Sequence, residues 1–420
     1  MPEPEERLSR PKQYPVTNTW NVETVETFAL EENRKTEPEH VWKTKLPCVD
    51  PDSWAPYSVQ FTHFLDGTQR TSSIREIPWQ KQGYGTVPFF VAQISCIVLQ
   101  RDARRLSVST ELSSFRVLLE VPIRFLARNA QKDVASAFKE LKAHDSYREF
   151  LWVDTSFRTQ ANTDDDPEAI PVPPLDGKYT PIPDAEFRQE AADPNWLSSL
   201  SRKWTMKYRD ALEQAVFDKL SDQLGKPTTD GKHFRLAVRD GTLTSVRGKF
   251  AQTAIGLSKS FNTRYLEPHL QTRVLALLMW HRTPVFKFTR DARGTEPDEA
   301  EFEDGPPPKS PQKHTRLSWY VRIRQIERTI PFLGILRVEI HPSLLPSGGS
   351  ADRWGEADSR IVSAISAAIV EEANPTSHPD PRWHNLIYPI SLCERYARAR
   401  MIRHDTIRYM NWGQRKVPYV

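Results

Sequence analysis

Cysteine and glycine are both scarce in this 420-residue chain, which has three cysteines and 16 glycines. Cys48, Cys96 and Cys393 are odd in number and far apart, and no CxxC pair occurs. This pattern disfavours a disulfide framework and a cysteine zinc site, and it indicates a reducing, cytoplasmic setting. Neither GxxxxGK[ST] nor GxGxxG is present, so both common nucleotide-binding fingerprints are excluded.

The chain also lacks long hydrophobic runs and a large excess of one charge. Its longest apolar runs, such as residues 274–280, are far too short to span a bilayer, and its first residues lack the basic and apolar regions of a signal peptide. We therefore expect no membrane association. Lys and Arg number 58 against 54 Asp and Glu, a net charge of +4, which excludes a polycationic tail. Nucleic-acid binding then requires that the basic residues be clustered.

Length and proline content bound the organisation of the chain. The length allows one large α/β domain with insertions, or two domains. Residues 162–185 and 292–315 are rich in proline and acidic residues, which predicts two exposed insertions. Residues 1–57 show little periodicity and are expected to form an N-terminal arm. Residues 58–420 are then the main domain.

Hydrophobic periodicity predicts strands mixed with helices. The clearest helix begins at Asn195, carries an amphipathic stripe and ends before Gly225 and Pro227. The mixture is typical of an α/β fold with one main sheet. Strands are predicted at 59–65, 88–99, 234–239, 319–324 and 335–340, and further helices at 129–143, 264–280, 358–373 and 388–404.

Two copies of Asp-Gly-Thr are the most informative feature. Residues 64–68 and 238–242 each place an aspartate, Asp66 or Asp240, where a hydrophobic strand is expected to end. Such carboxylates project into the crevice beyond a sheet, and on adjacent strands they could share divalent cations. Phosphodiester cleavage uses such cations to stabilise the attacking and leaving oxygens. An ordinary Asp-Gly turn is the simpler explanation of either copy alone.

Other charged residues extend the predicted site. Glu213, next to the buried stripe of its helix, is the first candidate for a third carboxylate, and Asp218 is a weaker one. Lys259 follows an apolar turn and could neutralise a phosphate. For each of the three, a solvated side chain is the alternative.

The predicted C-terminal helix is rich in arginine with aromatic residues interleaved. Arg395, Arg398 and Arg403 lie around Tyr396. Positive charge beside stacking groups is what a DNA strand requires. A solvated helix face is the alternative interpretation.

The order of these motifs resembles the NurA family of DNA-end-processing nucleases. The resemblance implies an RNase H-like core with a mixed central sheet flanked by helices, and a nuclease that depends on Mn²⁺ or Mg²⁺. It also implies a homodimer that works with a hexameric HerA-type ATPase translocase. The motifs that carry it are FLDGT at 64–68, AVRDGTL at 237–243, IGLSKS at 255–260, WYVRIR at 319–324, LRVEI at 336–340 and YPISL at 388–392.

The positions of these motifs imply which residues of this chain correspond to the family's functional residues. Asp66 and Asp240 resemble its first and second metal-binding aspartates. Glu213 is similar to the helix-borne acid between them, which implies a third metal ligand. Lys259 matches the lysine of the family's Gly-x-Ser-Lys motif, which implies a catalytic role.

One departure from the family bears on activity. The family has Ala-His shortly after its C-terminal Tyr-Pro motif, whereas this chain has Leu-Cys-Glu-Arg-Tyr at 392–396. Either Glu394 or His404 could replace that metal-site histidine. The leading hypothesis is a DNA nuclease in repair or phage defence. The alternative is a degenerate NurA-like subunit that binds DNA and an ATPase without cutting. A restriction-type nuclease would need a Glu-x-Lys strand close after an acid, and neither Asp66 nor Asp240 is followed by one.

Overall fold

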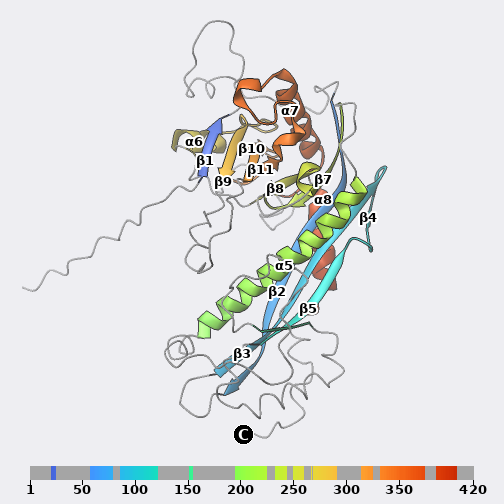
Figure 1. Cartoon of the computed structure of the whole chain (residues 1–420), viewed down its shortest axis with the longest axis vertical. Helices are drawn as coiled ribbons and strands as arrows, with labels where there is room; N and C mark the ends of the chain where they lie inside the picture. The colour runs from blue at the N-terminus through green and yellow to red at the C-terminus, as the bar shows by residue number, and fades with distance from the viewer. Residues whose placement is uncertain are drawn as a thin grey trace, which may run out of the picture.

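The structure is a computed structural model in which a mixed sheet is packed between helices (Figure 1). It describes residues 20–24, 57–78, 86–121, 151–154, 194–224, 232–243, 249–259, 266, 268–290, 314–324, 332–373 and 385–403.

The described strands form one mixed sheet in the order β1-β9-β10-β11-β8-β7-β2-β3-β5-β6, with β4 beside β3. Strands β2, β7 and β8 run parallel to one another, as do β5 and β6, and the other neighbours are antiparallel. This confirms the predicted α/β class with a mixed sheet. The strands are β1 (Trp20–Thr24), β2 (Ser58–Pro78), β3 (Thr86–Asp102), β4 (Arg105–Val108), β5 (Ser114–Val121), β6 (Leu151–Asp154), β7 (His233–Asp240), β8 (Ala254–Ser258), β9 (Phe286–Arg290), β10 (His314–Arg322) and β11 (Ile335–Ile340).

Helices cover both faces of the sheet, and side-chain alternation along β2 separates two cores. Phe64 belongs to the core under α7 and α8, whereas Leu65 belongs to the core under α5. From Phe64 to Ser73, even-numbered residues therefore face the α8 side of the sheet and odd-numbered ones face the α5 side. The described helices are α5 (Pro194–Leu224), α6 (Pro268–Leu275), α7 (Glu356–Glu371) and α8 (Tyr388–Arg400), with short 3-10 turns η3 (Lys249–Gln252), η5 (Pro342–Leu344) and η6 (Ala351–Arg353).

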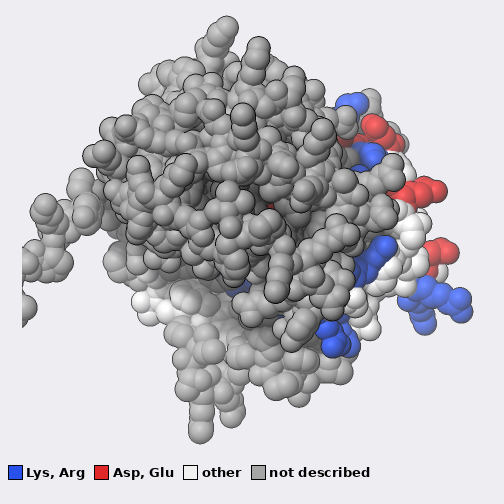
Figure 2. Space-filling view, turned by 90° about the horizontal axis from the view of Figure 1, so that it is seen from below, with Lys and Arg blue, Asp and Glu red and all other residues white. Residues whose placement is uncertain are grey.

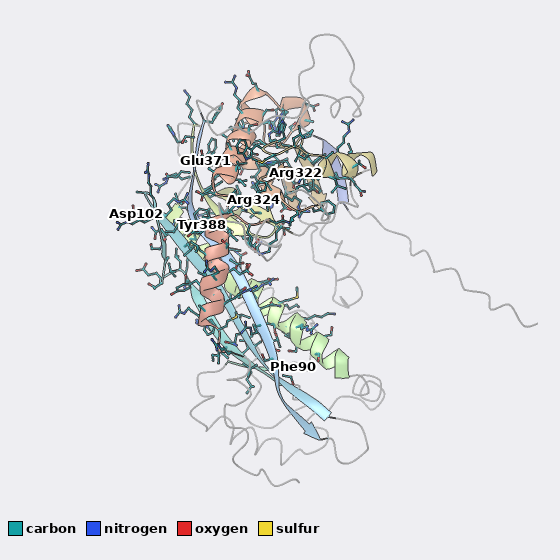
Figure 3. All side chains as sticks on the ribbon, turned by 180° about the vertical axis from the view of Figure 1, so that it is seen from behind. Phe90, Asp102, Arg322, Arg324, Glu371 and Tyr388 are labelled. Atoms are coloured by element: carbon teal, nitrogen blue, oxygen red, sulfur yellow. The ribbon has the colours of Figure 1, made fainter. Side chains whose placement is uncertain are left out.

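Strands β2 and β3 are 21 and 17 residues long, and they extend beyond the rest of the sheet. Pairing of β2 with β7 ends at Leu65, but pairing of β2 with β3 continues to Pro78. The distal parts of β2 and β3 form an arm, and α5 lies along it (Figure 1). From behind, Phe90 lies on this arm and Asp102 at the opposite end of β3 (Figure 3).

The prediction that the first strand ends at Asp66 is wrong, because β2 runs through Asp66 and Gly67 to Pro78. An Asp-Gly pair can stay extended when a long partner satisfies its backbone, and here Asp66 pairs with Ile97 and Gly67 with Cys96. The second copy behaves as predicted, since β7 ends at Asp240.

Several other elements differ from prediction at their ends. The helix expected at 264–280 covers only Pro268–Leu275, and the final helix ends at Arg400 instead of 404. β10 begins at His314, inside the second expected insertion, and β1 places a strand of the expected N-terminal arm beside β9. The helix predicted at 129–143 and the insertion at 162–185 lie outside the described residues. No described helix has the length and apolarity needed to cross a bilayer.

Candidate functional site

Two aspartates meet where β7 ends beside β2. The last parallel pair is Leu65 with Arg239, so Asp66 and Asp240 follow directly on neighbouring strands. Asp66 is only 5% exposed and its carboxyl shares a hydrogen bond with that of Asp240. Burial and the charge of Asp240 raise the pKa of Asp66 well above its usual value. The structure thus brings together the two residues that the repeated motif singled out.

Lys259 completes an ion pair at this position. It follows the end of β8, and its Nζ lies 2.7 Å from Oδ2 of Asp240. Burial alone would lower the pKa of Lys259, but the nearby carboxylates of Asp240, Asp66 and Glu394 outweigh it and raise that pKa. Lys259 is therefore a partly buried, charged ammonium beside two acids. The apolar turn predicted before it is wrong, because Ala254–Ser258 is strand β8, and its predicted contact with a phosphate stays a prediction.

Beside Asp240, a gap too small to hold a water molecule lies between the ends of the parallel strands and the start of α8. Because α8 begins at this point, its first turn forms one wall of the gap. The other wall is made of apolar side chains from β8 and β11. Its lining residues are Asp240, Leu257, Leu336, Asn385, Leu386, Ile387 and Ile390.

Glu213 lies on the α5 face of β2, above Gly67. A Cβ at Gly67 would be 1.7 Å from Oε1 of Glu213, so glycine here leaves room for the Glu213 carboxylate in its present position. The carboxylate of Glu213 is 2.7 Å from Nη2 of Arg239 and 3.2 Å from Nε of Arg209. Burial raises the pKa of Glu213 more than the two arginines lower it. Glu213 is thus engaged by arginines, while Asp66 faces α8.

The site therefore contains two adjoining carboxylates and no larger cluster. Within the described ranges, no group of three or more His, Cys, Asp or Glu side chains is arranged to hold a metal ion. Glu394 of α8 is close enough for its charge to raise the pKa of Asp66, but its carboxylate is ion-paired with Arg398. His404 lies outside the described residues. The weaker candidate Asp218 is exposed and accepts a hydrogen bond from Gln214.

The three arginines predicted to bind DNA are all exposed, but they are not all on a helix. Arg395 and Arg398 lie on α8, whereas Arg403 follows its end at Arg400. Arg400 stacks on Tyr396 at 5.8 Å from the ring centroid. Seen from below, the described basic and acidic side chains are interspersed along the visible edge (Figure 2).

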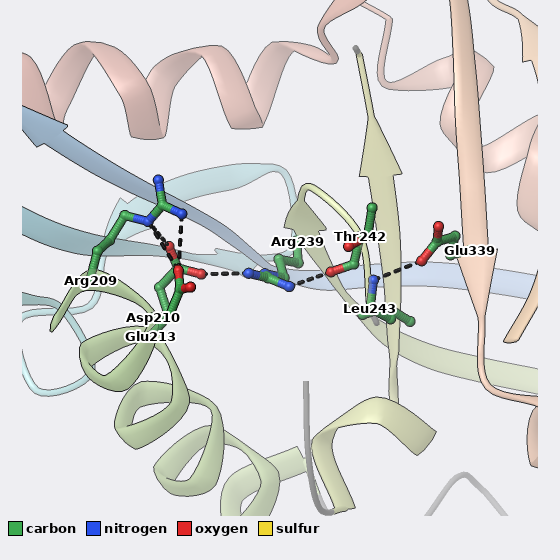
Figure 4. A network of polar contacts seen from close by, with 7 residues as sticks. All are labelled: Arg209, Asp210, Glu213, Arg239, Thr242, Leu243 and Glu339. Atoms are coloured by element: carbon green, nitrogen blue, oxygen red, sulfur yellow. Dashed lines mark hydrogen bonds and ion pairs between the residues drawn. The ribbon is translucent and has the colours of Figure 1, made fainter. Parts of the chain in front are cut away.

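The turn that carries Asp240 is held by residues that sequence reasoning missed. Glu339 of β11 accepts a hydrogen bond from the N–H of Leu243 at 2.8 Å, and Arg316 of β10 donates to the carbonyl of Leu243 at 3.2 and 3.3 Å. Arg239 donates to the carbonyl of Thr242 and also reaches Glu213 (Figure 4). Charged residues inside otherwise apolar strands, as in ILRVEI, mark such residues as unusual, but the sequence does not show which turn they contact.

Two glycines let this turn adopt its conformation. Gly241 has φ of +103°, a region that side chains rarely adopt, and its N–H donates to the carbonyl of Leu257 at 2.7 Å. A Cβ at Gly256 would lie 2.7 Å from the carbonyl oxygen of Gly241. The glycine of the IGLSKS motif is therefore required by close backbone approach.

The sequence matches no protein-family model. It also matches no curated protein.

Proposed function

We propose that this protein is a Mn²⁺- or Mg²⁺-dependent deoxyribonuclease of the NurA type, acting on DNA ends together with a HerA-type ATPase in repair or phage defence. The observation that carries the proposal is the buried pair of Asp66 and Asp240 beside Lys259. Two negatively charged carboxylates in contact repel each other and destabilise the fold unless a proton or a cation lies between them. Such a pair is therefore suited to bind a cation.

The chemistry of the donor set fits a hard divalent cation. Mg²⁺ is usually held by one or two carboxylates, with water and substrate phosphate completing its shell, so the pair Asp66 and Asp240 suffices on the protein side. Glu394, on the α8 side with Asp66, is the acid available for a second ion, whereas Glu213 lies on the opposite face and would have to leave its arginines and reorient to serve as the third ligand. When bound, the metal stabilises charge on the attacking and leaving oxygens of the phosphodiester.

The protein's own residues would bind and orient the substrate. Asp66 is rigid because β2 continues on both sides of it, and Asp240 is fixed by its turn. Lys259 would hold Asp240 through its ammonium and present positive charge to the scissile phosphate. Arg395, with the other exposed arginines of this region, would guide the strand.

The topology supports an RNase H-like core for this function. The first acid lies on a strand flanked by antiparallel β3 and parallel β7, and the second lies at the end of β7. Helix α5 precedes β7 and covers one face, while α8 covers the other. Both carboxylates then lie where the parallel pairing of β2 with β7 ends.

A degenerate subunit that binds DNA and an ATPase without cutting is the second candidate. It is favoured by the absence of a third adjoining acid in the described part of the chain and by the arginines that occupy Glu213. In that case Asp66 and Asp240 would be a structural pair.

A cleavage assay separates the two candidates. Wild type, Asp66→Asn, Asp240→Asn and the exposed control Asp222→Asn are incubated with linear DNA and Mn²⁺, Mg²⁺ or EDTA, with and without a HerA-type ATPase. A nuclease predicts metal-dependent cleavage by wild type and Asp222→Asn, and loss of cleavage in both site variants with unchanged unfolding midpoints. Wild-type rates in either site variant at saturating Mn²⁺ would refute the two-aspartate site.

Assembly is tested with the same proteins. Sizing of wild type alone and with the ATPase tests the proposed homodimer and the proposed complex. DNA binding and ATPase association without cleavage under any metal condition would establish the degenerate subunit instead.

A further inference from the structure

We propose that Glu339 and Arg316 are positioning residues that fix the turn 240–243 and thereby hold the carboxylate of Asp240 in a metal-binding position. This inference rests on the proposed function, because it assigns a task to residues behind the same site. Neither residue touches Asp240 itself. They act on the backbone of Leu243, three residues further along the chain.

The contacts satisfy both polar groups of one buried residue. The N–H of Leu243 donates to Oε2 of Glu339, and its carbonyl accepts from Nε and Nη2 of Arg316. Leu243 is fully buried, Glu339 is 4% exposed and Arg316 is 7% exposed. Water therefore cannot easily replace either partner, and loss of one would leave a buried backbone group without a hydrogen bond.

Each residue of the turn is tied to a different element. Asp240 is paired with Lys259 after β8, and the N–H of Gly241 donates to Leu257 within β8. The carbonyl of Thr242 accepts from Arg239 of β7, which is itself held by Glu213 of α5. Leu243 is tied to β10 and β11 (Figure 4). The turn is thus restrained on both faces of the sheet.

Such restraint is needed because Gly241 has no side chain, so its backbone dihedral angles are less restricted than those of other residues. Gly241 has φ of +103°, and no atom lies within 4 Å of the position that a Cβ would take there. The pairing of Asp240 and Gly241 with Leu257 holds the end of β7, and the ties on Leu243 restrain the backbone that follows, so losing them would loosen the position of the Asp240 carboxylate relative to Asp66. A metal site tolerates little such displacement, and groups that orient its ligands typically contribute about 10–100-fold in affinity.

A contribution to overall stability is a weaker explanation of why the charged side chains of Glu339 and Arg316 are buried here. Buried ion pairs are often no more stabilising than well-packed apolar residues, since their desolvation is costly. Glu339 is also paired with Arg337 at 2.6 Å, while the guanidinium of Arg316 donates to the carbonyl of Leu243. Their arrangement fits the task of fixing one backbone geometry.

The test measures Mn²⁺ binding directly by electron paramagnetic resonance, without DNA. Glu339→Gln keeps an acceptor for Leu243 and is expected to bind Mn²⁺ within a few-fold of wild type. Glu339→Ala removes the acceptor and is expected to weaken binding by about 10-fold or more. Arg316→Met serves as a second variant should Glu339→Ala fail to fold. Arg101→Met, which breaks the Arg101–Glu372 ion pair away from the turn, is the matched control.

Cleavage and hydrogen exchange provide two further measurements. The Mn²⁺ concentration for half-maximal cleavage should rise in Glu339→Ala while the rate at saturating Mn²⁺ stays within a few-fold. The amide of Leu243 should also exchange faster. A folded Glu339→Ala or Arg316→Met with wild-type Mn²⁺ affinity would overturn the positioning role, as would an equal loss in Arg101→Met. A wild type that binds no Mn²⁺ would refute the proposed function itself.

Discussion

Glu120 should make the stability of the arm depend on pH near neutrality. It lies on β5 beneath α5 and is fully buried, and its carboxyl accepts hydrogen bonds from the hydroxyls of Ser201 and Thr205. Burial raises the pKa of Glu120 from its ordinary 4.5 to about 7, although the two hydroxyls lower it. The folded protein therefore prefers this carboxyl protonated.

The sign and size of the effect follow from linkage. Between pH 4.5 and about 7 the folded state holds a proton that the unfolded state has lost, so the free energy of unfolding falls as pH rises through this window. At about 1.4 kcal/mol for each pH unit, the loss between pH 5 and pH 8 is roughly 2–3 kcal/mol. Above pH 8 no further loss is expected from this group.

Urea unfolding of wild type and Glu120→Gln from pH 5 to pH 8 tests this reasoning. The amide cannot titrate, so the stability difference between the two proteins should change by roughly 2–3 kcal/mol over that range, in favour of the variant at high pH. Glu111→Gln, at an exposed turn, is the control and should follow wild type. A constant difference between wild type and Glu120→Gln would refute the assignment of a neutral buried carboxyl.

Three further predictions concern the site. Gly67→Ala should destabilise the protein by about 1–3 kcal/mol or displace Glu213, because the added methyl group would lie 1.7 Å from the Glu213 carboxylate. In Gly355→Ala the added methyl group meets no atom closer than 3.9 Å, and urea unfolding of the two variants compares their stabilities. Lys259→Met should move the pH profile of metal-dependent cleavage to higher pH, since loss of the ammonium raises the pKa of Asp66 further. Lys249→Met, at an exposed position, is the control. An unchanged pH profile in Lys259→Met would contradict the pairing of Lys259 with the two aspartates. Changing Arg395, Arg398 and Arg403 to Ala should weaken DNA binding and reduce its salt slope by roughly 0.7–0.9 for each lost phosphate contact. If dimerisation or ATPase association is lost while the slope is unchanged, these arginines contact a partner, and if neither changes they are merely solvated.

The sequence was most informative where one periodicity dominated. The long amphipathic pattern predicted α5 closely, and the apolar runs predicted β7 and β11. The position of Asp66 within a strand was missed because Asp-Gly is read locally as a turn. What keeps it extended is its pairing with β3, a contact between distant segments that local preference does not include.

The same limit applies to the candidate site. Repetition of Asp-Gly-Thr after two apolar runs, together with the order of the other motifs, suggested that Asp66 and Asp240 share a site, although a turn was the simpler explanation of either copy alone. The environment of Glu213 was not predictable, since helical periodicity gives the buried stripe but not which arginines meet it. Glu339 was missed because a charged residue in a strand carries no signal until the neighbouring turn is known.

β2 continues from the core into the arm, with a shift of register between Ser73 and Arg75, and Asp66 lies near the point where the arm leaves the core. From Asp66 to Pro78 the strand extends about 40 Å at roughly 3.3 Å per residue. On that length, a displacement of about 4 Å at the far end of the arm corresponds to a rotation of only about 6° at its base. A rigid rotation of the arm about its base would therefore move its far end much more than it would move the carboxylate pair of Asp66 and Asp240.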